Sequence, residues 1–470
     1  MIRVSLEQLL RATGGEAVEF DRRDAAFTGI GIDSRTVRPG ELFWAIQGER
    51  HDGHHFVAEA MKQGAAGAVI SAAAVEATNG PRIVVHKTLS ALGRFARWHR
   101  RRGRARIVGV TGSVGKTTTR EMIHAVLAAE KQGTRSPRNW NNHVGLPLSL
   151  LDVEPDHDFA VLELGASRIG EIRELARIAG PEIGVVTAIG LGHLAGFGSI
   201  ETIQAAKEEL IESLPETGVA VLPQDDPRCR AIAERAACRV VLVGEGPQAD
   251  LQASGVQSQN ERLRFLVQGV RFELPVAGRH HLRAALLAAA VGREFGIALE
   301  TAAEALAGFR PVAGRCRVER IGAWTAIDDT YNANPESMRA ACDLLAGWTT
   351  DGRRVLVVGE MLELGEAAAE CHRELGRQIA AAGIDRLLAV GRFAEDVTHA
   401  AIAAGMDRTR VEAAEDVEHA GRALQQELGP GDVVLVKGSR GTRMERVIEQ
   451  LRGDQQNIEG NQRVMIPNGQ

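Results

Sequence analysis

The feature that most constrains the fold is a glycine-containing loop between an expected strand and an expected helix. An apolar run at 106–110 leads into Thr-Gly-Ser-Val-Gly-Lys-Thr-Thr at 111–118, and a helix is predicted from about 117 to 129. A strand, a glycine turn and a helix that begins at Lys-Thr form the arrangement of a phosphate-binding loop (P-loop). Strands that alternate with helices along the rest of the chain then favour a mostly parallel α/β sheet.

The residues of this loop suit nucleotide phosphates. Gly112 and Gly115 let backbone N–H groups turn toward an anion. Lys116 adds a positive charge near the β and γ phosphates, and the Thr117 hydroxyl can bind Mg²⁺. The spacing departs from the general Walker pattern, because Val110 stands where its first glycine would be. The predicted phosphate contacts are Gly112, Ser113, Val114, Gly115, Lys116, Thr117 and Thr118.

Length and patterning predict three α/β domains. The chain has 470 residues, 44% of them hydrophobic, which is enough for three separate cores. An arginine- and glycine-rich stretch at 100–104 and a second break near 311–315 mark the boundaries. The alternating pattern at 251–276 predicts an antiparallel edge on the central parallel sheet, and the third domain reads as Rossmann-like. The expected divisions are 1–104, 105–312 and 313–452, with a flexible polar tail at 453–470.

Charge and cysteine content exclude several classes of protein. The net charge is -5 with both signs interspersed, which gives no support for nucleic-acid binding. The arginine-rich run at 94–106 is interpreted as a solvated helix end and linker. The five cysteines form no CxxC pair, which suits a reducing compartment and argues against a zinc site. With no apolar leader and no apolar run of membrane-spanning length, a cytoplasmic protein without an integral membrane segment is expected.

Three further residues are candidates from their position alone. Glu163 ends an apolar strand, and ligands of parallel sheets gather at such ends, so its carboxylate could hold Mg²⁺. His193 lies in a glycine-rich loop after the next expected strand, and Lys207 lies in an expected helix beside two glutamates. Position alone also permits a carboxylate without metal at Glu163 and solvated side chains at His193 and Lys207.

Several runs together resemble a known family. They lie at 33–43, 48–56, 111–118, 139–147, 163–165, 193–199, 328–339, 359–365 and 436–440. On these runs the chain resembles the Mur ligase family over nearly its whole length, to about Gln450. The run at 328–339 is similar to the D-alanyl-D-alanine-adding branch, and the Asp-Asn-Pro-Arg run expected of a diaminopimelate-adding relative does not occur.

The resemblance implies an ATP-dependent acid–D-amino-acid ligase of peptidoglycan precursor synthesis, expected as a monomer. It implies UDP-N-acetylmuramoyl-tripeptide and D-alanyl-D-alanine as substrates, joined through an acyl phosphate with release of ADP and phosphate. It implies two Mg²⁺ ions, one bound by Thr117. The other would be held by Glu163, His193 and a carbamylated Lys207, because a carbamate is an oxygen donor and an ammonium is not. The implied catalytic residues are Lys116, Glu163, His193 and Lys207.

The resemblance also implies binding residues in all three domains. Positions that match nucleotide contacts of the third domain are Arg315, Asp329 and Asn332. Positions that match UDP-sugar and substrate contacts are Ser34, Arg35, Asp52, Gly53, His54, Asn141 and Asn142. Local turn and capping roles are the alternative for the aspartates and asparagines. The chain departs from the family at His281 and Ala284, where asparagines are usual, so the adenine contacts are expected to differ.

Other functions remain open at this stage. A folylpolyglutamate synthetase-like ligase would lack the segments around Ser34–Arg35 and 52–54, whereas an earlier-step Mur ligase would differ in its acceptor. A regulatory P-loop ATPase would release no phosphate in response to an amino acid, and it leaves the run at 329–339 unexplained.

Overall fold

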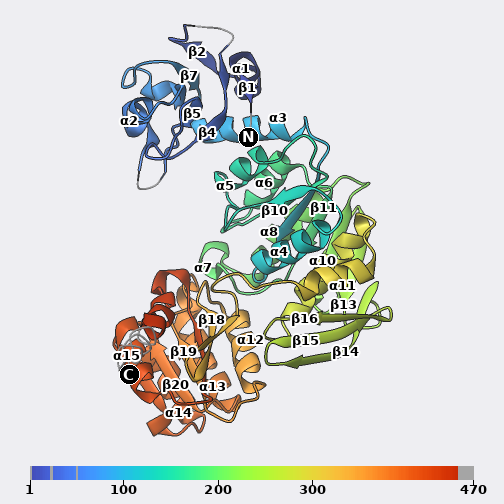
Figure 1. Ribbon diagram of the computed structural model, residues 1–470, viewed down its shortest axis with the longest axis vertical. Helices are drawn as coiled ribbons and strands as arrows, with labels where there is room; N and C mark the ends of the chain where they lie inside the picture. Colours follow the sequence, from blue (N-terminus) through green and yellow to red (C-terminus); the bar gives the residue numbers. More distant parts are fainter. Residues whose placement is uncertain (1–2, 22–24, 49–50, 454–470) are drawn as a thin grey trace, which may run out of the picture.

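The computed structural model describes residues 3–21, 25–48 and 51–453, which form three bodies in a row (Figure 1). Each body is an α/β unit on its own sheet, with five, nine and six strands in chain order. The predicted α/β class with three domains is therefore confirmed. Of the tail expected at 453–470, residues 454–470 lie outside the described residues. In the part of the chain that is described, no helix has both the length and the apolar character of a membrane span.

The N-terminal body has the strand order β2-β7-β6-β5-β4, with β2 as its antiparallel edge. Its strands are β2 (Glu16–Val18), β4 (Gly29–Gly31), β5 (Glu41–Trp44), β6 (Gly67–Ser71) and β7 (Arg82–Val85), and β1 (Val4–Ser5) pairs with β3 (Ala26–Phe27) beside them. Its helices are α1 (Leu6–Thr13), η1 (Gly53–Phe56), α2 (Val57–Lys62), η2 (Ala72–Ala74) and α3 (Thr88–Arg100).

Helix α3 joins the first body to the second. Arg94 donates from Nη2 to the Thr13 carbonyl oxygen over 2.6 Å, and Arg100 pairs with Glu182 of the central body over 2.7 Å. Apolar side chains of α3 share one core with both bodies. The arginine-rich stretch therefore contributes partnered side chains to a junction as well as exposed ones.

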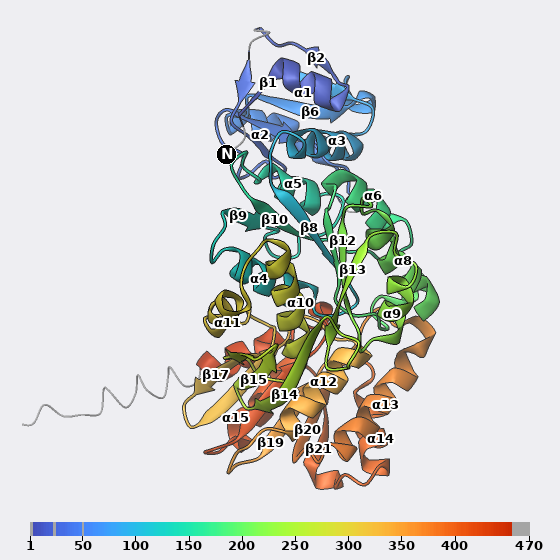
Figure 2. The same cartoon turned by 90° about the vertical axis from the view of Figure 1, so that its right-hand side faces the viewer.

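The central body has the order β16-β15-β14-β13-β12-β11-β8-β10-β9, parallel from β9 to β14. Its strands are β8 (Arg106–Thr111), β9 (Gly133–Arg135), β10 (Phe159–Glu163), β11 (Ile183–Val186), β12 (Val219–Pro223), β13 (Arg239–Gly244), β14 (Leu251–Gln259), β15 (Arg262–Val267) and β16 (Val270–Leu274). β14, β15 and β16 pair antiparallel, as the alternation at 251–276 predicts. Figure 2 shows this edge turned toward the third body.

Helices cover both faces of the central sheet. They are α4 (Lys116–Leu127), α5 (Gly145–Leu151), α6 (Glu171–Ala179), α7 (Leu194–Phe197), α8 (Ile200–Glu212), α9 (Pro227–Ala233), α10 (His281–Glu294) and α11 (Leu299–Ala307). Side chains of β8 alternate between the two cores, with Ile107 facing α5, α6 and α8 and Val108 facing α4 and α10. Strands buried on both faces read as continuous apolar runs, which explains why the central strands are recognisable from sequence.

The third body has the order β17-β18-β22-β19-β20-β21, with β17 antiparallel and the rest parallel. Its strands are β17 (Arg317–Ile321), β18 (Trp324–Asp329), β19 (Arg354–Val358), β20 (Arg386–Val390), β21 (Val411–Ala414) and β22 (Val433–Lys437). Its helices are α12 (Pro335–Ala346), η3 (Gly365–Ala367), α13 (Ala368–Ala381), α14 (Ala394–Ala403), η4 (Arg408–Arg410), α15 (Val417–Glu427) and η5 (Arg440–Thr442). The carboxyl ends of β18 and β22 face the P-loop of the central body.

Candidate functional site

The P-loop connects the end of β8 to the start of α4 through two glycines with positive φ. Gly112 has φ +144°, and a Cβ there would lie 2.1 Å from the Thr187 hydroxyl. Gly115 has φ +84° and stands at the N-cap of α4. Both positions therefore require glycine, one for space and one for backbone conformation.

The loop is held in shape from β11 and the loop that follows it. Thr187 donates its hydroxyl to the Val114 carbonyl oxygen over 2.5 Å, and Ser113 donates to the Gly190 carbonyl oxygen over 2.8 Å. Lys116 donates from Nζ to the Gly112 carbonyl oxygen over 2.6 Å, so the ammonium lies inside the loop. Burial lowers the pKa of Lys116, and the nearby Glu163 carboxylate opposes that shift. An anion bound in the loop would favour the charged ammonium.

Glu163 receives hydrogen bonds from three sides at the end of β10, next to β8. Its Oε2 accepts from the Thr117 hydroxyl over 3.1 Å and from Arg120 Nη1 over 3.2 Å. Its Oε1 accepts from Asn141 Nδ2 over 2.9 Å. The structure thus brings Thr117, Glu163 and Asn141, all predicted site residues, to one point beside the loop.

This cluster suits a magnesium ion on chemical grounds. A hydroxyl and a carboxylate from neighbouring elements are hard oxygen ligands, and Mg²⁺ in nucleotide sites takes one or two of these together with phosphate oxygens and water. Arg315 of the third body reaches the same point, donating from Nη2 to the Thr117 hydroxyl over 3.3 Å.

His193 and Lys207 lie farther from this point. His193 has φ +61° at the start of α7, and its Nδ1 pairs with Glu363 of the third body. Lys207 is 2% exposed in α8, and its ammonium lies 5.1 Å from the Phe197 ring centroid. Desolvation, followed by the charge of Lys116, lowers the pKa of Lys207 to about 7. Neither His193 nor Lys207 contacts Glu163 among the described interactions.

In the third body, the predicted Asp329 takes part in a buried ion pair. Lys437 Nζ donates to Asp329 Oδ2 over 2.6 Å and to the Asn332 carbonyl oxygen over 2.9 Å. The other Asp329 oxygen accepts from the Cys316 backbone N–H over 3.2 Å. Asp329 therefore fixes the backbone beside Arg315, which carries the charge that faces the P-loop.

Two cavities meet at the P-loop. One, of about 590 Å³, runs from the loop over α10 to the start of α12, and the other, of about 670 Å³, runs between the central and third bodies. Both are lined by Ser113, Val114, Gly115, Arg315, Asn332, Ala333 and Asn334. Glu163, His193, Asn141 and Asn142 line only the second cavity, and Thr118 and Asp329 line only the first.

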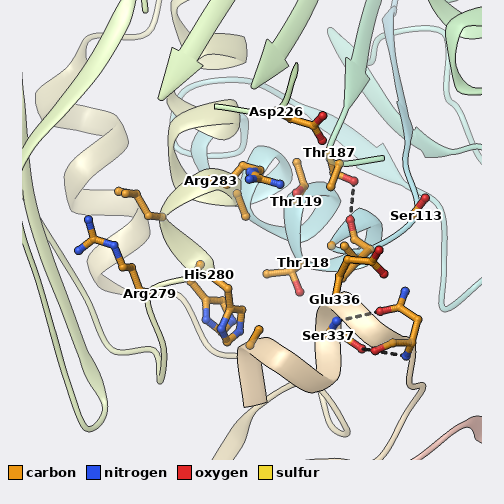
Figure 3. Close-up of a pocket in the computed structure, with 18 of the residues that line it drawn as sticks. Ser113, Thr118, Thr119, Thr187, Asp226, Arg279, His280, Arg283, Glu336 and Ser337 are labelled. Atoms are coloured by element: carbon orange, nitrogen blue, oxygen red, sulfur yellow. Dashed lines mark hydrogen bonds between the residues drawn. The ribbon is translucent and has the colours of Figure 1, made fainter. Parts of the chain in front are cut away.

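The first cavity is lined by His280 and His281 at the start of α10, and Figure 3 shows His280 there. His281 is 2% exposed and its Nδ1 has no hydrogen-bond partner, while the His280 Nε2 lies 3.5 Å from the Cys316 sulfur. Burial lowers the pKa of both imidazoles, so both are neutral at pH 7. Glu336 of α12 reaches across to the central body and accepts from the Leu191 backbone N–H over 2.9 Å. Ala284 also lines this cavity, so both positions at which the chain is expected to depart from the family lie in its wall.

The predicted sugar-site residues lie in the first body and line neither cavity. Asp52 caps η1 and pairs with His54 over 2.5 Å, and His54 Nε2 accepts from the Ser71 backbone N–H. Ser34 donates to Glu59 over 2.8 Å, and Arg35 pairs with its neighbour Asp33. Gly53 packs against the Ile46 backbone, which leaves no room for a Cβ. Asn142 accepts from the Val144 and Gly145 backbone N–H groups, a local turn role.

Four residues of the site are not predicted as site residues, although Tyr331, Glu363 and Lys437 lie in runs that carry the family resemblance. Arg120 reads as an ordinary helix arginine, yet it is 2% exposed and pairs with Glu163 and Glu121. Lys437 and Glu363 become significant only through partners more than 100 residues away. Tyr331 stacks under the Arg315 guanidinium at 4.0 Å.

Comparison with family models matches all three bodies. The Mur ligase family catalytic domain model matches residues 26–100, the Mur ligase middle domain model 110–292, and the Mur ligase glutamate ligase domain model 314–440.

Individual relatives agree with these matches over nearly the full length. UDP-N-acetylmuramoyl-tripeptide–D-alanyl-D-alanine ligase of Bacillus subtilis is 34% identical over 96% of this chain and 99% of its own. A crystal structure of MurF from Acinetobacter baumannii superposes with a TM-score of 0.88 at 31% identity, covering 96% of this chain and 99% of that one. A MurF ligase structure from Thermotoga maritima in complex with ADP has a TM-score of 0.82 at 30% identity, covering 91% and 98%.

Proposed function

Because the chain belongs to the Mur ligase family, we propose that it is the ATP-dependent ligase that joins D-alanyl-D-alanine to UDP-N-acetylmuramoyl-tripeptide. The observation that carries the proposal is the meeting of two cavities at one P-loop. One cavity is the place for ATP and the other for the carboxylate and the amine that are joined. A regulatory ATPase would need only the first.

The reaction proceeds in two steps. An oxygen of the terminal tripeptide carboxylate attacks the γ phosphorus of ATP, the bond to the bridging oxygen breaks, and ADP leaves. The D-alanyl-D-alanine amine then attacks the acyl-phosphate carbonyl carbon, and the tetrahedral intermediate expels phosphate while the nitrogen loses a proton. Phosphoryl transfer depends chiefly on positioning and on neutralising charge, since both reactants are anions.

The residues at the junction suit these demands. Lys116 and the backbone N–H groups of Gly112–Gly115 face the phosphates, and Arg315 brings a second cation from the third body. Thr117 and Glu163 would hold Mg²⁺, which when bound neutralises phosphate charge and orients the transferred group. Asn141 fixes the Glu163 carboxylate.

For a second Mg²⁺ we propose Glu163, His193 and a carbamylated Lys207. Lys207 is buried beside Phe197 with no ion-pair partner among the described residues, an environment that favours the neutral amine. A neutral amine is the form that adds to CO2. Loss of activity in Lys207→Ala with partial recovery in added short carboxylic acids supports the carbamate, whereas an unmodified Lys207 in a nucleotide-bound structure of the active enzyme rules it out.

The remaining assignments belong to the same proposal. Ser34, Arg35, Asp52, Gly53 and His54 contribute to the UDP-sugar site, and the reaction takes place in the cytoplasm, where ATP is supplied, with the protein acting as a monomer. The domains are 1–104, 105–312 and 313–452.

One assay tests the function. Purified protein with ATP, Mg²⁺ and UDP-N-acetylmuramoyl-tripeptide is expected to release phosphate only when D-alanyl-D-alanine is added. Mass spectrometry is expected to find the pentapeptide product in equal amount. Phosphate release that ignores the dipeptide would refute the ligase assignment.

A further inference from the structure

The lining of the second cavity includes a cation that is not placed to bind nucleotide phosphates. Its lining includes Lys116, Arg315 and Arg440, together with the imidazoles of His143 and His193. Lys116 lies inside the P-loop, and Arg315 lines both cavities and contacts Thr117.

The two imidazoles are already engaged. His143 pairs with Glu174 over 2.7 Å, and His193 pairs with Glu363. Among the described lining residues, Arg440 is therefore the cation that belongs to the second cavity alone and points to neither the P-loop nor a buried partner.

Arg440 has a free side of its guanidinium available to a ligand. The side chain is 67% exposed, and its ion pair joins Nη1 to Glu445 over 3.2 Å. Since a guanidinium carries five N–H donors in a planar fork, this pair leaves donors for a second carboxylate. Surface ion pairs of this kind contribute little, so a ligand carboxylate can compete with it or share it.

Tyr331 sets the distance between Arg440 and the reaction centre. The Arg315 guanidinium lies 4.0 Å from the Tyr331 ring centroid and the Arg440 guanidinium 5.9 Å from the same centroid. The two cations are thus no farther apart than these two distances together. An extended dipeptide spans about 7 Å, which is within this limit.

The wall between these cations suits small side chains. Ala333 and Gly441 line it, with Leu362, which is 42% exposed, at the rim. A Cβ on Gly441 would lie 2.8 Å from a Leu362 methyl group, so the wall is already close-packed there. Methyl groups would pack on this wall, whereas long side chains would meet it.

We propose that Arg440 binds the terminal carboxylate of the dipeptide acceptor, with the acceptor amine directed toward the P-loop. The inference rests on the proposed function and adds to it the residue that selects an acceptor with a free carboxylate. Arg440 is then a specificity-determining residue, remote from the bond that forms, and it contributes to acceptor binding more than to turnover.

The test compares D-alanyl-D-alanine with D-alanyl-D-alaninamide, which has the same amine and lacks the negative charge. Hydrogen bonds to a charged group are strong enough that Arg440→Met is expected to raise KM for the dipeptide about 10- to 100-fold. KM for the amide is expected to be high in the wild type and to change less than about threefold in the variant. KM of Arg440→Lys for the dipeptide is expected to lie between the values of the wild type and Arg440→Met, because lysine keeps the charge and loses the planar fork of donors.

Arg446→Met is the matched control, since Arg446 is an exposed arginine in a surface ion pair with Glu418 and lies outside the cavity lining. Unchanged KM values for ATP and the UDP-tripeptide in Arg440→Met establish that the site is intact. Equal KM values for the dipeptide in Arg440→Met and Arg446→Met overturn the inference. The inference is also overturned if Arg440→Met raises KM by the same factor for the dipeptide and for the amide, because that result indicates a structural role. A wild type that ligates neither acceptor refutes the proposed function itself.

Discussion

Substitution of Arg120 tests how the Glu163 carboxylate is held in place. Its guanidinium is buried and contacts Glu163 over 3.2 Å, Glu121 over 2.6 Å and the Arg138 carbonyl oxygen. Arg120→Met keeps much of the volume and removes these contacts. The variant leaves Glu163 buried with hydrogen bonds and with the charge of Lys116 nearby, but without its ion-pair partner.

The expected loss of stability in Arg120→Met depends on the contacts that Glu163 and Glu121 keep. Removing one partner of a buried ion pair costs about 3–5 kcal/mol, because the other charge stays desolvated. Glu163 keeps the Thr117 hydroxyl and the Asn141 amide, and Glu121 keeps Arg135 over 2.7 Å. These remaining contacts place the expected loss at the lower end, about 3 kcal/mol.

Hydrogen exchange read by mass spectrometry measures this loss where it occurs, on peptides from β8 and β10. Arg135→Met is the control, because Arg135 is 39% exposed and its pair with Glu121 contributes about 1 kcal/mol or less. A change in exchange free energy no larger than in Arg135→Met would show that Arg120 does not hold Glu163. Mg²⁺-dependent protection of these peptides is also expected to weaken in Arg120→Met alone.

Three other perturbations have defined outcomes. Lys116→Ala is expected to lower kcat at least a thousandfold, on the order expected when a phosphate-facing charge is lost; steady-state kinetics with near-normal kcat would place the site elsewhere. Lys207→Met is expected to abolish ligation yet stabilise the unliganded protein by ~4 kcal/mol near pH 7 in CO2-free buffer. Burial lowers the pKa of Lys207 from 10.5 to about 7, so the wild type loses stability as pH falls from 10.5 to 7, and the difference measured by denaturant titration should vanish near pH 11. Glu363→Gln is expected to raise the Mg²⁺ concentration for half-maximal activity about tenfold. In the control Glu366→Gln, that concentration is expected to stay unchanged.

The sequence predicts most of the features that depend on neighbouring residues in the chain. The P-loop, the buried central strands and the antiparallel edge at β14–β16 follow from residue order, because a strand buried on both faces must be continuously apolar and an edge must alternate. Short β9 has three half-buried residues, Gly133 to Arg135, and carries neither pattern. Its place beside β10 depends on pairing with a distant strand.

The site is predictable only in part, for a physical reason. Thr117, Glu163 and Asn141 converge because β10 lies between β8 and β9 in the sheet and the carboxyl ends of these parallel strands meet at one edge. Arg120 and Lys437 are charged residues in otherwise ordinary helix and strand positions. Whether such a residue is exposed or buried against a carboxylate depends on tertiary packing, which local pattern does not encode.

His193 shows how a local expectation and a long-range contact combine. The imidazole has two nitrogens, and its Nδ1 faces Glu363, which leaves Nε2 free to bind a metal ion. A carboxylate on the far nitrogen fixes the tautomer and raises the basicity of the ligating one. Glu363 belongs to the third body and His193 to the central one, where the Ala195 backbone N–H also donates to the Glu363 carbonyl oxygen over 2.9 Å. One of the contacts between the third and central bodies would therefore also orient His193 as the proposed metal ligand, so docking and metal binding are expected to favour each other.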